Sequence, residues 1–552
     1  MHKGHNNSLE ETFPPLEFTY TEGVPATSFK EVSGIIPGGI DGQNNEWADL
    51  YSEGISGILN MRNDAWYFKP NHGDKKYVNP DAESAPSFGG IKSEVPKPNV
   101  VRDAKTSFRL NDIDSDGFPE LVVQGKGLNG FFSRLPDGKW LNFRNFNKFP
   151  NIDLDDANIR FMDVTGDGLA DIVISKGDYF DIYFSEGKEG YSQYRKVHCG
   201  DSHGSAPRIV FSDYHRRIFL ADMSGDGLTD IVRITNQGIV YWPNLGYGKF
   251  GEKVIMGNPP LLDSTDQFDT RYVHLVDVDG TGTADLLYIS KGKIRYCKNL
   301  SGNAWQEEPL PAGLAVNANQ QTFVQTVDLL GNGTQCIVVS SSLPAQDNKL
   351  RYWELTSGIK PFLLSEINNN MGGITKLHYC SSTKFYMQDK FESGKQKAEG
   401  RKANYPWITK LPFPVHVLEK VETIDLVGNK HFTNRYAYHH GYFDPAEREF
   451  RGFGMVEQWD SECYAESGMQ NAESGAPCHC GLDPQSPPVY TKTWFHTGFY
   501  KNRSQISKLF ADEYFNNEEP DAWRLPDTVL PENLSGEETR EACLVLKKVY
   551  MI

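Results

Sequence analysis

The sequence has little of three features that mark common protein classes: basic clusters, long apolar runs and paired cysteines. Its 73 acidic side chains outnumber 56 basic ones, which gives a net charge of −17. Because no Lys/Arg cluster offsets this charge, nucleic acid is an unsuitable partner. No segment approaches the roughly 18 uninterrupted apolar residues of a membrane-spanning helix. The start, MHKGHNNSLEETFPPLEF, also lacks the apolar region of a conventional signal peptide.

Eight cysteines are scattered along the chain at unrelated spacings. Such a distribution is not the framework of a small disulfide-stabilised domain. Cys478, His479 and Cys480 form a short group that resembles a metal knuckle, but no second pair stands at ligand spacing. We therefore expect neither a disulfide framework nor a zinc site.

What the sequence does contain is a repeat. An aspartate-rich turn runs directly into a short aliphatic strand five times, starting at Asp112, Asp163, Asp222, Asp277 and Asp328. Successive turns start 51 to 59 residues apart, which is the period of a propeller blade and is too long for a helical solenoid unit. A fainter copy starts at Asp49 and keeps the Asp, the Gly and the apolar run. The pattern predicts six units.

Each unit also carries a second strand that is rich in aromatic residues and is followed by a polar turn, as in IVYWPNLGYGKF and IRYCKNLSGNAW. An apolar strand, a glycine turn and an aromatic strand repeated in this order are typical of radially arranged antiparallel sheets. We interpret the aromatic residues as packing between blades. The sequence therefore predicts an all-β fold that begins with a six-bladed β-propeller at residues 41–358, after a lead-in at residues 1–40.

The turns resemble loops that bind Ca²⁺ through oxygen ligands. Acidic or hydroxyl side chains at loop positions 1, 3, 5 and 9 can converge because glycine at position 6 permits a sharp turn. The candidate ligands are Asp112, Asp114, Asp116 and Glu120 in one loop, Asp163, Thr165, Asp167 and Asp171 in the next, and Asp222, Ser224, Asp226 and Asp230 in the third. Because its ligands carry the most charge, the Asp112 loop is expected to bind Ca²⁺ most tightly.

The alternative is that these are turns closed by Asx hydrogen bonds, without a metal. The loop at Asp277 has Thr281 in place of the acid at position 5, and the loop at Asp328 has lost its other acids. A metal is not expected in the Asp328 loop.

After the repeats the sequence pattern changes to longer segments of alternating apolar and polar residues, such as ITKLHYCSSTKFYMQD and WITKLPFPVHVLEKVETID. These segments predict longer strands and a second all-β domain at residues 359–460. FESGKQKAEGRKANYP reads as an exposed polar loop between its strands. In an alternating strand, at most one of His439 and His440 is expected to face a core. Residues 461–489 have the composition of a low-complexity insertion, and residues 490–552 continue the second domain.

Several long segments carry a specific resemblance. They are FLADMSGDGLTDIVRI, YWPNLGYGKFG, DQFDTRYVHLVDVDGTGTADLLYI, INNNMGG, PWITKLPFPVHVLEKVE and YAYHHGYFDPAEREFRGFGMVEQWD. These segments resemble the B component of bacterial insecticidal toxin complexes and the related SpvB virulence-protein family, with FG-GAP-type propeller repeats. The resemblance covers roughly residues 13–460 and 488–545 and is more specific than the aspartate loops alone.

The resemblance implies a secreted structural component, extracellular after export or cytoplasmic before it. Its propeller would dock on and gate a channel-forming A component, and the start of a strand-rich Rhs-type shell, from about Pro361, would help enclose a toxic C component. The family that the chain resembles has a large glycine-rich domain upstream, which is absent here, and a long shell downstream, which here stops at EACLVLKKVYMI. We therefore expect the chain to be a fragment or one piece of a split gene.

The resemblance also raises the question of catalysis, because SpvB-like proteins can carry an ADP-ribosyltransferase. That enzyme needs an Arg, a Ser-Thr-Ser strand and a Glu-x-Glu pair. Here Ser381, Ser382 and Thr383 are in the wrong order, and Glu447 and Glu449 lie at the start of the REFRGFG shell motif, Glu447 directly before it and Glu449 within it. We expect no enzyme activity. The other functional hypothesis is a calcium-dependent adhesion or carbohydrate-binding propeller, as in integrins, but its class lacks the REFRGFG and LPFPVHV motifs.

Overall fold

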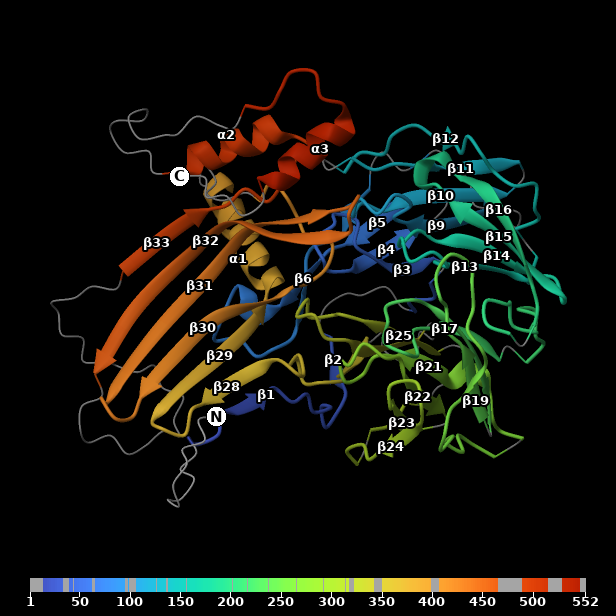
Figure 1. Ribbon diagram of the computed structural model, residues 1–552, viewed down its shortest axis with the longest axis horizontal. Coiled ribbons are helices and arrows are strands. Elements are labelled where there is room, and N and C mark those ends of the chain that lie inside the picture. Colours follow the sequence, from blue (N-terminus) through green and yellow to red (C-terminus); the bar gives the residue numbers. More distant parts are fainter. Residues whose placement is uncertain are drawn as a thin grey trace, which may run out of the picture.

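The computed structural model resolves a propeller and a large curved sheet that lie side by side (Figure 1). It describes residues 13–546 except for 33–38, 43, 62–64, 95–97, 99–105, 126, 136–137, 155, 201, 216, 237, 265, 291, 313, 317–321, 342–349, 399–406, 465–488 and 515–528. No helix among the described residues is long and apolar enough to cross a membrane.

Six four-stranded antiparallel sheets form the blades of the propeller, which confirms the predicted all-β fold with its six-bladed propeller. The first blade contains β3 (Asn45–Ala48), β4 (Gly57–Met61), β5 (Trp66–Lys69) and β8 (Lys92–Ser93). The second contains β9 (Ser107–Asn111), β10 (Glu120–Gly125), β11 (Leu128–Phe132) and β12 (Arg144–Asn145). The third contains β13 (Ile159–Met162), β14 (Asp171–Ser175), β15 (Tyr179–Ser185) and β16 (Tyr191–His198). The next two contain β17 (Ile218–Ala221), β18 (Asp230–Thr235), β19 (Gly238–Trp242) and β20 (Val254–Ile255); and β21 (Val273–Val276), β22 (Asp285–Ser290), β23 (Lys293–Asn299) and β24 (Trp305–Glu308).

The last blade is completed by the start of the chain. It contains β25 (Thr322–Val327), β26 (Cys336–Ser341), β27 (Arg351–Glu354) and, as its outer strand, β2 (Lys30–Glu31). Val32 then packs in a core cluster that joins Ile58 of the first blade to Val338 and Tyr352 of the last. The lead-in segment therefore closes the ring, and blades distant in sequence share a core.

The second strand of each blade explains the apolar runs in the sequence. In β10, β14 and β22 nearly every residue is buried, because neighbouring blades cover both faces of the strand. A strand packed on both faces needs apolar residues at successive positions rather than at alternate ones. Leu121 and Val123 are fully buried, and each such side chain contributes about 1.5–3 kcal/mol through removal from water.

The second domain is a seven-stranded antiparallel sheet. It contains, in order across the sheet, β1 (Glu17–Tyr20), β28 (Leu364–Asn368), β29 (Gly373–Ser381), β30 (His416–Asp425), β31 (Lys430–Asp444), β32 (Glu449–Tyr464) and β33 (Val489–Trp494). Strand β1 comes from the start of the chain, so the lead-in contributes to both domains. Two short strands, β6 (Asn71–Asp74) and β7 (Pro86–Phe88), pair beside the first blade.

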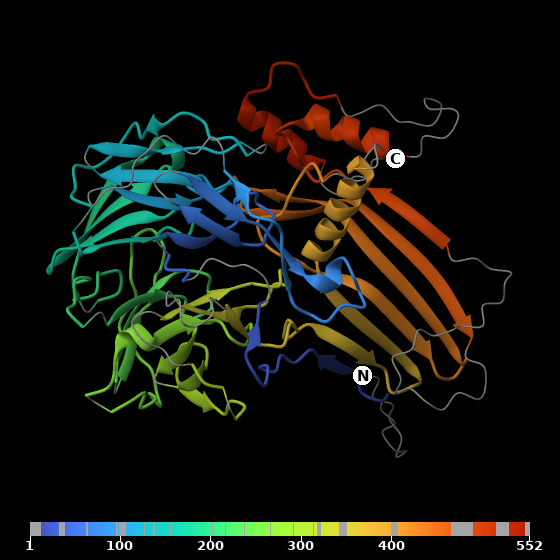
Figure 2. The ribbon, with the colours of Figure 1, turned by 180° about the vertical axis from the view of Figure 1, so that it is seen from behind.

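Three α-helices accompany the sheet. Helix α1 (Ser382–Ala398) lies on the face of the sheet that is turned toward the first blade (Figure 2). Helices α2 (Arg503–Glu513) and α3 (Gly536–Val545) lie together at one end of the sheet (Figure 1). Ile506 and Phe510 of α2 pack on Met455 and Trp494, which anchors α2 on β32 and β33. The predicted insertion at residues 461–489 falls almost entirely outside the described residues.

Two details of the predicted sheet were wrong. The expected strand at ITKLHYCSSTKFYMQD ends at Ser381, and α1 takes up its second half and part of the expected polar loop. The Ser381 hydroxyl accepts the Thr383 amide at this transition, and Phe385 and Met387 then enter the core. The expectation that at most one of His439 and His440 is buried also fails, because both are, at 5% and 1% exposed. His440 has a φ of 56°, next to a register shift in β31, and this bulge interrupts the alternation.

Candidate metal loops and the domain junction

One hydrogen bond recurs in all six aspartate loops. In each loop, Oδ2 of the aspartate at position 1 accepts the amide of the glycine at position 6. The donor–acceptor distances are 2.7 Å for Gly54, 2.8 Å for Gly117, 2.6 Å for Gly168, 2.8 Å for Gly227, 3.0 Å for Gly282 and 2.7 Å for Gly333. The six glycines have φ between 73° and 89°, a conformation that glycine adopts without steric cost. The loops are therefore closed Asx-type turns, whether or not a metal binds.

The acid at position 9 has a different role from the one expected of a ligand. Asp171, Asp230 and Asp285 are fully buried at the start of a central strand. Each uses one oxygen to accept the amide of loop position 2 and the other to accept an amide at or just after the end of the third strand of its blade. For Asp230 these donors are Met223 at 3.0 Å and Asn244 at 2.8 Å. The position 9 carboxylate thus joins its loop to the rest of the blade.

Burial raises the pKa of these carboxyl groups, although the backbone amides oppose the shift. The pKa rises to about 7 for Glu120, Asp171, Asp230 and Asp285. It rises to about 6 for Asp112 at position 1, also through burial. Burial therefore makes the ionised carboxylates unfavourable. A cation bound in the loop would favour their ionised forms and offset this penalty.

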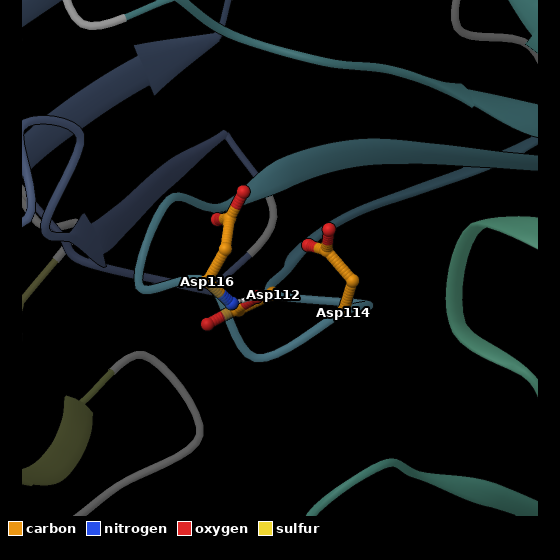
Figure 3. Close-up of side chains that lie close together, drawn as sticks. All are labelled: Asp112, Asp114 and Asp116. Atoms are coloured by element: carbon orange, nitrogen blue, oxygen red, sulfur yellow. Dashed lines mark hydrogen bonds between the residues drawn. The ribbon is translucent and has the colours of Figure 1, made fainter. Parts of the chain in front are cut away.

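The acids at positions 1, 3 and 5 converge in one of the three predicted loops. Asp112, Asp114 and Asp116 each offer an oxygen within 4.8 Å of the others, and Figure 3 shows Asp114 and Asp116 pointing to the same side of the turn. Among the described residues, the second such group is Asp277, Asp279 and Asp285. The sequence analysis did not assign that group as ligands, although acids at positions 1, 3 and 9 were the signal that could have found it.

The other two predicted loops place their candidate ligands differently. Asp163 accepts the amides of Thr165, Gly166 and Gly168, while Asp167 accepts the Leu169 amide. Asp222 and Asp226 repeat this pattern with Gly225, Gly227 and Leu228. The hydroxyls of Thr165 and Ser224 stand at position 3 in place of an acid. These carboxylates are oriented by the backbone rather than gathered into a group of three.

A lysine from the next blade lies among the acids of the Asp112 loop. The Lys188 ammonium is 2.7 Å from Asp114 Oδ2, 2.8 Å from Glu120 Oε1 and 3.5 Å from Asp116 Oδ2. Lys188 belongs to a one-turn 3-10 helix, Gly187–Glu189, that connects β15 and β16. The lysine therefore links the second and third blades through the loop that was expected to bind Ca²⁺ most tightly.

Other loops are also joints between blades. The Asn244 side chain donates to the Asp163 carbonyl at 2.9 Å, and the Asn299 side chain donates to the Met223 carbonyl at 2.9 Å. The Asn71 side chain likewise donates a hydrogen bond to the Leu329 carbonyl at 2.9 Å, and this bond joins the first blade to the last. In each case the turn after the third strand of one blade seats on the aspartate loop of the preceding blade. The loops therefore fasten the ring, including its point of closure.

The end of the propeller that carries the loops also meets the sheet domain. Pro412 packs on Gly117, Arg448 donates to the Gly166 carbonyl at 3.4 Å, and Lys360 lies over Gly280. The His416 ring covers Gly333 so closely that a β-carbon there would lie 2.4 Å from its Cε1 atom. The aspartate loops are thus the platform on which the second domain rests.

The strongest contact on this platform is made by Glu53, at position 5 of the Asp49 loop. Its carboxylate accepts from Lys390 at 2.6 Å and from the Tyr386 hydroxyl at 2.6 Å, both on α1, and lies 3.7 Å from Lys410. Burial acts to raise the pKa of Glu53, but the ammonium groups of Lys390 and Lys410 lower it below its usual value. A buried carboxylate between two cations therefore joins the domains.

Glu447, which the Glu-x-Glu pattern made a candidate for catalysis, has structural contacts, and so do its neighbour Arg448 and the buried His439. Glu447 pairs with Arg540 of α3 at 3.0 Å, and Arg448 lies in the turn between β31 and β32 with a φ of 52°. His439 contacts Asp389 at 2.6 Å and Glu457 at 3.5 Å. Burial opposes the charged ring, yet these carboxylates raise the pKa of His439 to about 9. A histidine held in its charged form by two acids is a structural ion cluster rather than a general base near neutral pH.

Asp230→Asn should destabilise the protein more at pH 5 than at pH 8, in the presence of a chelator. A carboxyl whose pKa rises from about 3.9 to about 7 on folding stabilises the fold below pH 4. That contribution is lost as the pH rises through 7. The difference in the free energy of unfolding between parent and variant should therefore be about 2–3 kcal/mol smaller at pH 8 than at pH 5. Denaturant unfolding at both pH values measures it, with exposed Asp178→Asn as control. A difference in unfolding free energy that grows with pH would contradict this, because it would show that the amide hydrogen bonds lower the pKa of Asp230 more than burial raises it.

Glu53→Gln should weaken the domain junction. Loss of the carboxylate leaves Lys390 and Lys410 without their shared anion, which costs about 1–3 kcal/mol for partly exposed partners. We expect the thermal unfolding of the two domains to separate into distinct transitions in calorimetry. The control is Glu392→Gln, which removes a carboxylate from an exposed pair with Lys395 on α1. Equal effects of the two substitutions would contradict a junction role for Glu53.

Comparison with known proteins agrees with this architecture. Residues 299–474 match the family described as the insecticide toxin TcdB middle/N-terminal region. No curated protein sequence matches the chain significantly.

Solved structures match nearly the whole chain. The Tc holotoxin pore of Photorhabdus luminescens is 26% identical over 98% of this chain and 24% of that one, with a TM-score of 0.79. The TcdB2-TccC3-Cdc42 structure is 25% identical over the same shares, with a TM-score of 0.67. A TcdB2-TccC3-TEV structure is 26% identical over 97% of this chain, with a TM-score of 0.64. This chain spans about a quarter of the length of these proteins.

The propeller, the sheet domain that rests on its aspartate loops, the family match over residues 299–474 and the shared architecture lead to one conclusion: over nearly its whole length the chain resembles the TcB-type B components of the bacterial insecticidal toxin complexes.

Proposed function

We propose that the chain is a non-catalytic structural component of a secreted bacterial toxin complex. Its propeller docks on and gates a channel-forming A component, and its sheet forms part of a shell that encloses a toxic C component. The titles of the matched structures name TcdB2 together with TccC3, and this pairing supports a C-type partner. The family match across the sheet domain also favours this function over an adhesion propeller, whose class lacks such a domain.

The observation that carries the proposal is the unequal use of the two ends of the propeller. The aspartate-loop end is committed to the sheet domain through Glu53, Gly117 and Gly333. In an antiparallel meander, alternate connections lie at opposite ends of the strands. The connections from one blade to the next, such as residues 199–217 between β16 and β17, therefore lie at the other end. We assign that end to the A component.

Tyr214 is the most exposed aromatic side chain at this other end, at 92%. Exposed aromatic residues are common anchors of protein interfaces. Tyr214→Ala should therefore weaken binding of the full chain to its cognate A component by about tenfold or more. The measurement is binding to the immobilised A component by surface plasmon resonance.

Tyr247→Ala is the matched control, because Tyr247 is 72% exposed at the aspartate-loop end, where the adjacent Gly248 amide donates to the Val164 carbonyl. It should leave binding unchanged. Loss of binding in Tyr247→Ala with full binding in Tyr214→Ala would assign the A component to the wrong end. Absence of binding in the parent chain would overturn the docking proposal itself.

Calcium is the second part of the proposal. We infer that Ca²⁺ binds the loops at Asp163 and Asp222, where position 1 and position 5 carboxylates flank a hydroxyl at position 3. The Ser224 hydroxyl oxygen is buried without a hydrogen-bond partner among the described residues, which is consistent with a ligand role. A bound ion would neutralise the loop acids and add its binding energy to folding. The Asp112 loop differs, because the Lys188 ammonium already lies among its acids.

Asp226→Asn should reduce the rise in Tm that millimolar Ca²⁺ gives to the full chain, because it removes a charged ligand. Asp266→Asn, at an exposed site in the connection between β20 and β21, is the control and should leave that rise unchanged. Differential scanning fluorimetry with Ca²⁺, Mg²⁺ and chelator measures the effect. A Tm of the parent that is the same in Ca²⁺ and in chelator would exclude calcium from these loops.

A further inference from the structure

In two aspartate loops, position 3 is an acid and a lysine ammonium forms an ion pair with that acid. In the Asp112 loop, Lys188 Nζ lies 2.7 Å from Asp114 Oδ2. In the Asp277 loop, Lys298 Nζ lies 2.5 Å from Asp279 Oδ2. These are the same two loops in which three carboxylates converge within 4.8 Å. A cluster of acids and an ammonium from this chain therefore occur together.

The two loops with a hydroxyl at position 3 show the opposite pattern. Thr165 and Ser224 occupy position 3 in the loops at Asp163 and Asp222. Across the part of the chain that the structure describes, no lysine or arginine forms an ion pair with Asp163, Asp167, Asp222 or Asp226. Added negative charge in a loop is thus matched by a positive charge from the protein.

The two lysines reach their loops from different elements. Lys188 comes from the turn of the following blade, which is seated so closely that a β-carbon on Gly187 would lie 3.2 Å from the Ile113 carbonyl oxygen. Lys298 comes from β23 of the same blade, next to Asn299, whose amide donates to Asp285 at 2.7 Å. In both cases the backbone next to the lysine is held against the aspartate loop. The ammonium groups are therefore positioned by the fold, unlike those of mobile surface lysines.

The contacts of Lys188 fit an ammonium group well. It has three N–H donors, and three carboxylates, from Asp114, Glu120 and Asp116, lie at 2.7, 2.8 and 3.5 Å. Burial opposes the charge, but hydrogen bonds to Asp114 and Glu120 raise the pKa of Lys188 above its usual value. The lysine is therefore charged near neutral pH.

We propose that Lys188 takes the place of a metal ion in the Asp112 loop, and Lys298 in the Asp277 loop. These two loops are then calcium-independent joints of the propeller. Ca²⁺ needs six to eight oxygen ligands at about 2.3–2.6 Å, and an ammonium within hydrogen-bond distance of Asp114 and Glu120 occupies the space and the lone pairs that the ion requires. Removal of the lysine should convert the loop into a calcium site.

The experiment uses the full chain and follows Tm in chelator, in Mg²⁺ and in a Ca²⁺ titration. Lys188→Met should lower Tm in chelator, because three acids lose their cation, and Ca²⁺ should restore it. The apparent Ca²⁺ affinity should exceed that of the parent by about tenfold or more. Lys176→Met is the matched control, because Lys176 pairs with Asp156 at 3.4 Å on the surface of the same blade, and its Ca²⁺ response should equal that of the parent.

Asp114→Asn assigns the response to this loop. It should abolish the gained Ca²⁺ response in the Lys188→Met background and should leave the Ca²⁺ response of the parent unchanged. The proposal is overturned if Lys188→Met responds to Ca²⁺ as the parent does, or if Asp114→Asn alone removes a Ca²⁺ response from the parent. Should Lys188→Met fail to fold, Lys298→Met with Asp279→Asn gives the same comparison in the Asp277 loop, and the single Asp114→Asn variant still tests the parent.

Discussion

A hydrogen bond from a glycine amide to an aspartate carboxylate, repeated six times, fixes the geometry on which the rest of the molecule depends. It holds each loop in a closed turn whose glycine has a positive φ. The following strand then starts at a set place, and the position 9 acid reaches back to tie loop and blade together. A hydrogen bond to a charged group contributes about 1.5–3 kcal/mol, so the loops also stabilise the ring that they shape. The same turns present the surface on which the sheet domain rests.

This arrangement has an electrostatic cost, because it gathers carboxylates at one end of the propeller. Burial raises the pKa of several of them to about 6 or 7, which shows that their charged forms are disfavoured without compensation. The protein supplies cations from three sources: the next blade through Lys188, the same blade through Lys298, and the sheet domain through Lys390 and Lys410. The compensation of loop charge and the assembly of the domains are therefore the same set of contacts.

The sequence predicted the features that repeat or that follow from local chemistry. Six blades follow from the period of the aspartate turns, and the turns themselves follow from Asp and Gly at fixed spacing. Contacts over long distances had no local signal: Lys188 lies 74 residues from Asp114, and β2 lies more than 300 residues from its partner β27. Helix α1 was missed because KFYMQD was interpreted as the continuation of the strand that becomes β29, and FESGKQK was interpreted as part of a polar loop despite its helical preference. The bulge at His440 was missed because a single left-handed residue leaves no periodic trace.

The central claim is that the aspartate-loop end of the propeller is the joint between blades and between domains. Zero-length carbodiimide cross-linking of the full chain, read by mass spectrometry, tests it directly, because it joins carboxylates only to amines in contact with them. The account predicts amide links from Lys188 to Asp114 or Glu120 and from Lys390 to Glu53, whose atoms lie 2.6–2.8 Å apart. Links from Lys390 or Lys410 to acids at the other end of the blades, such as Asp178, would contradict it.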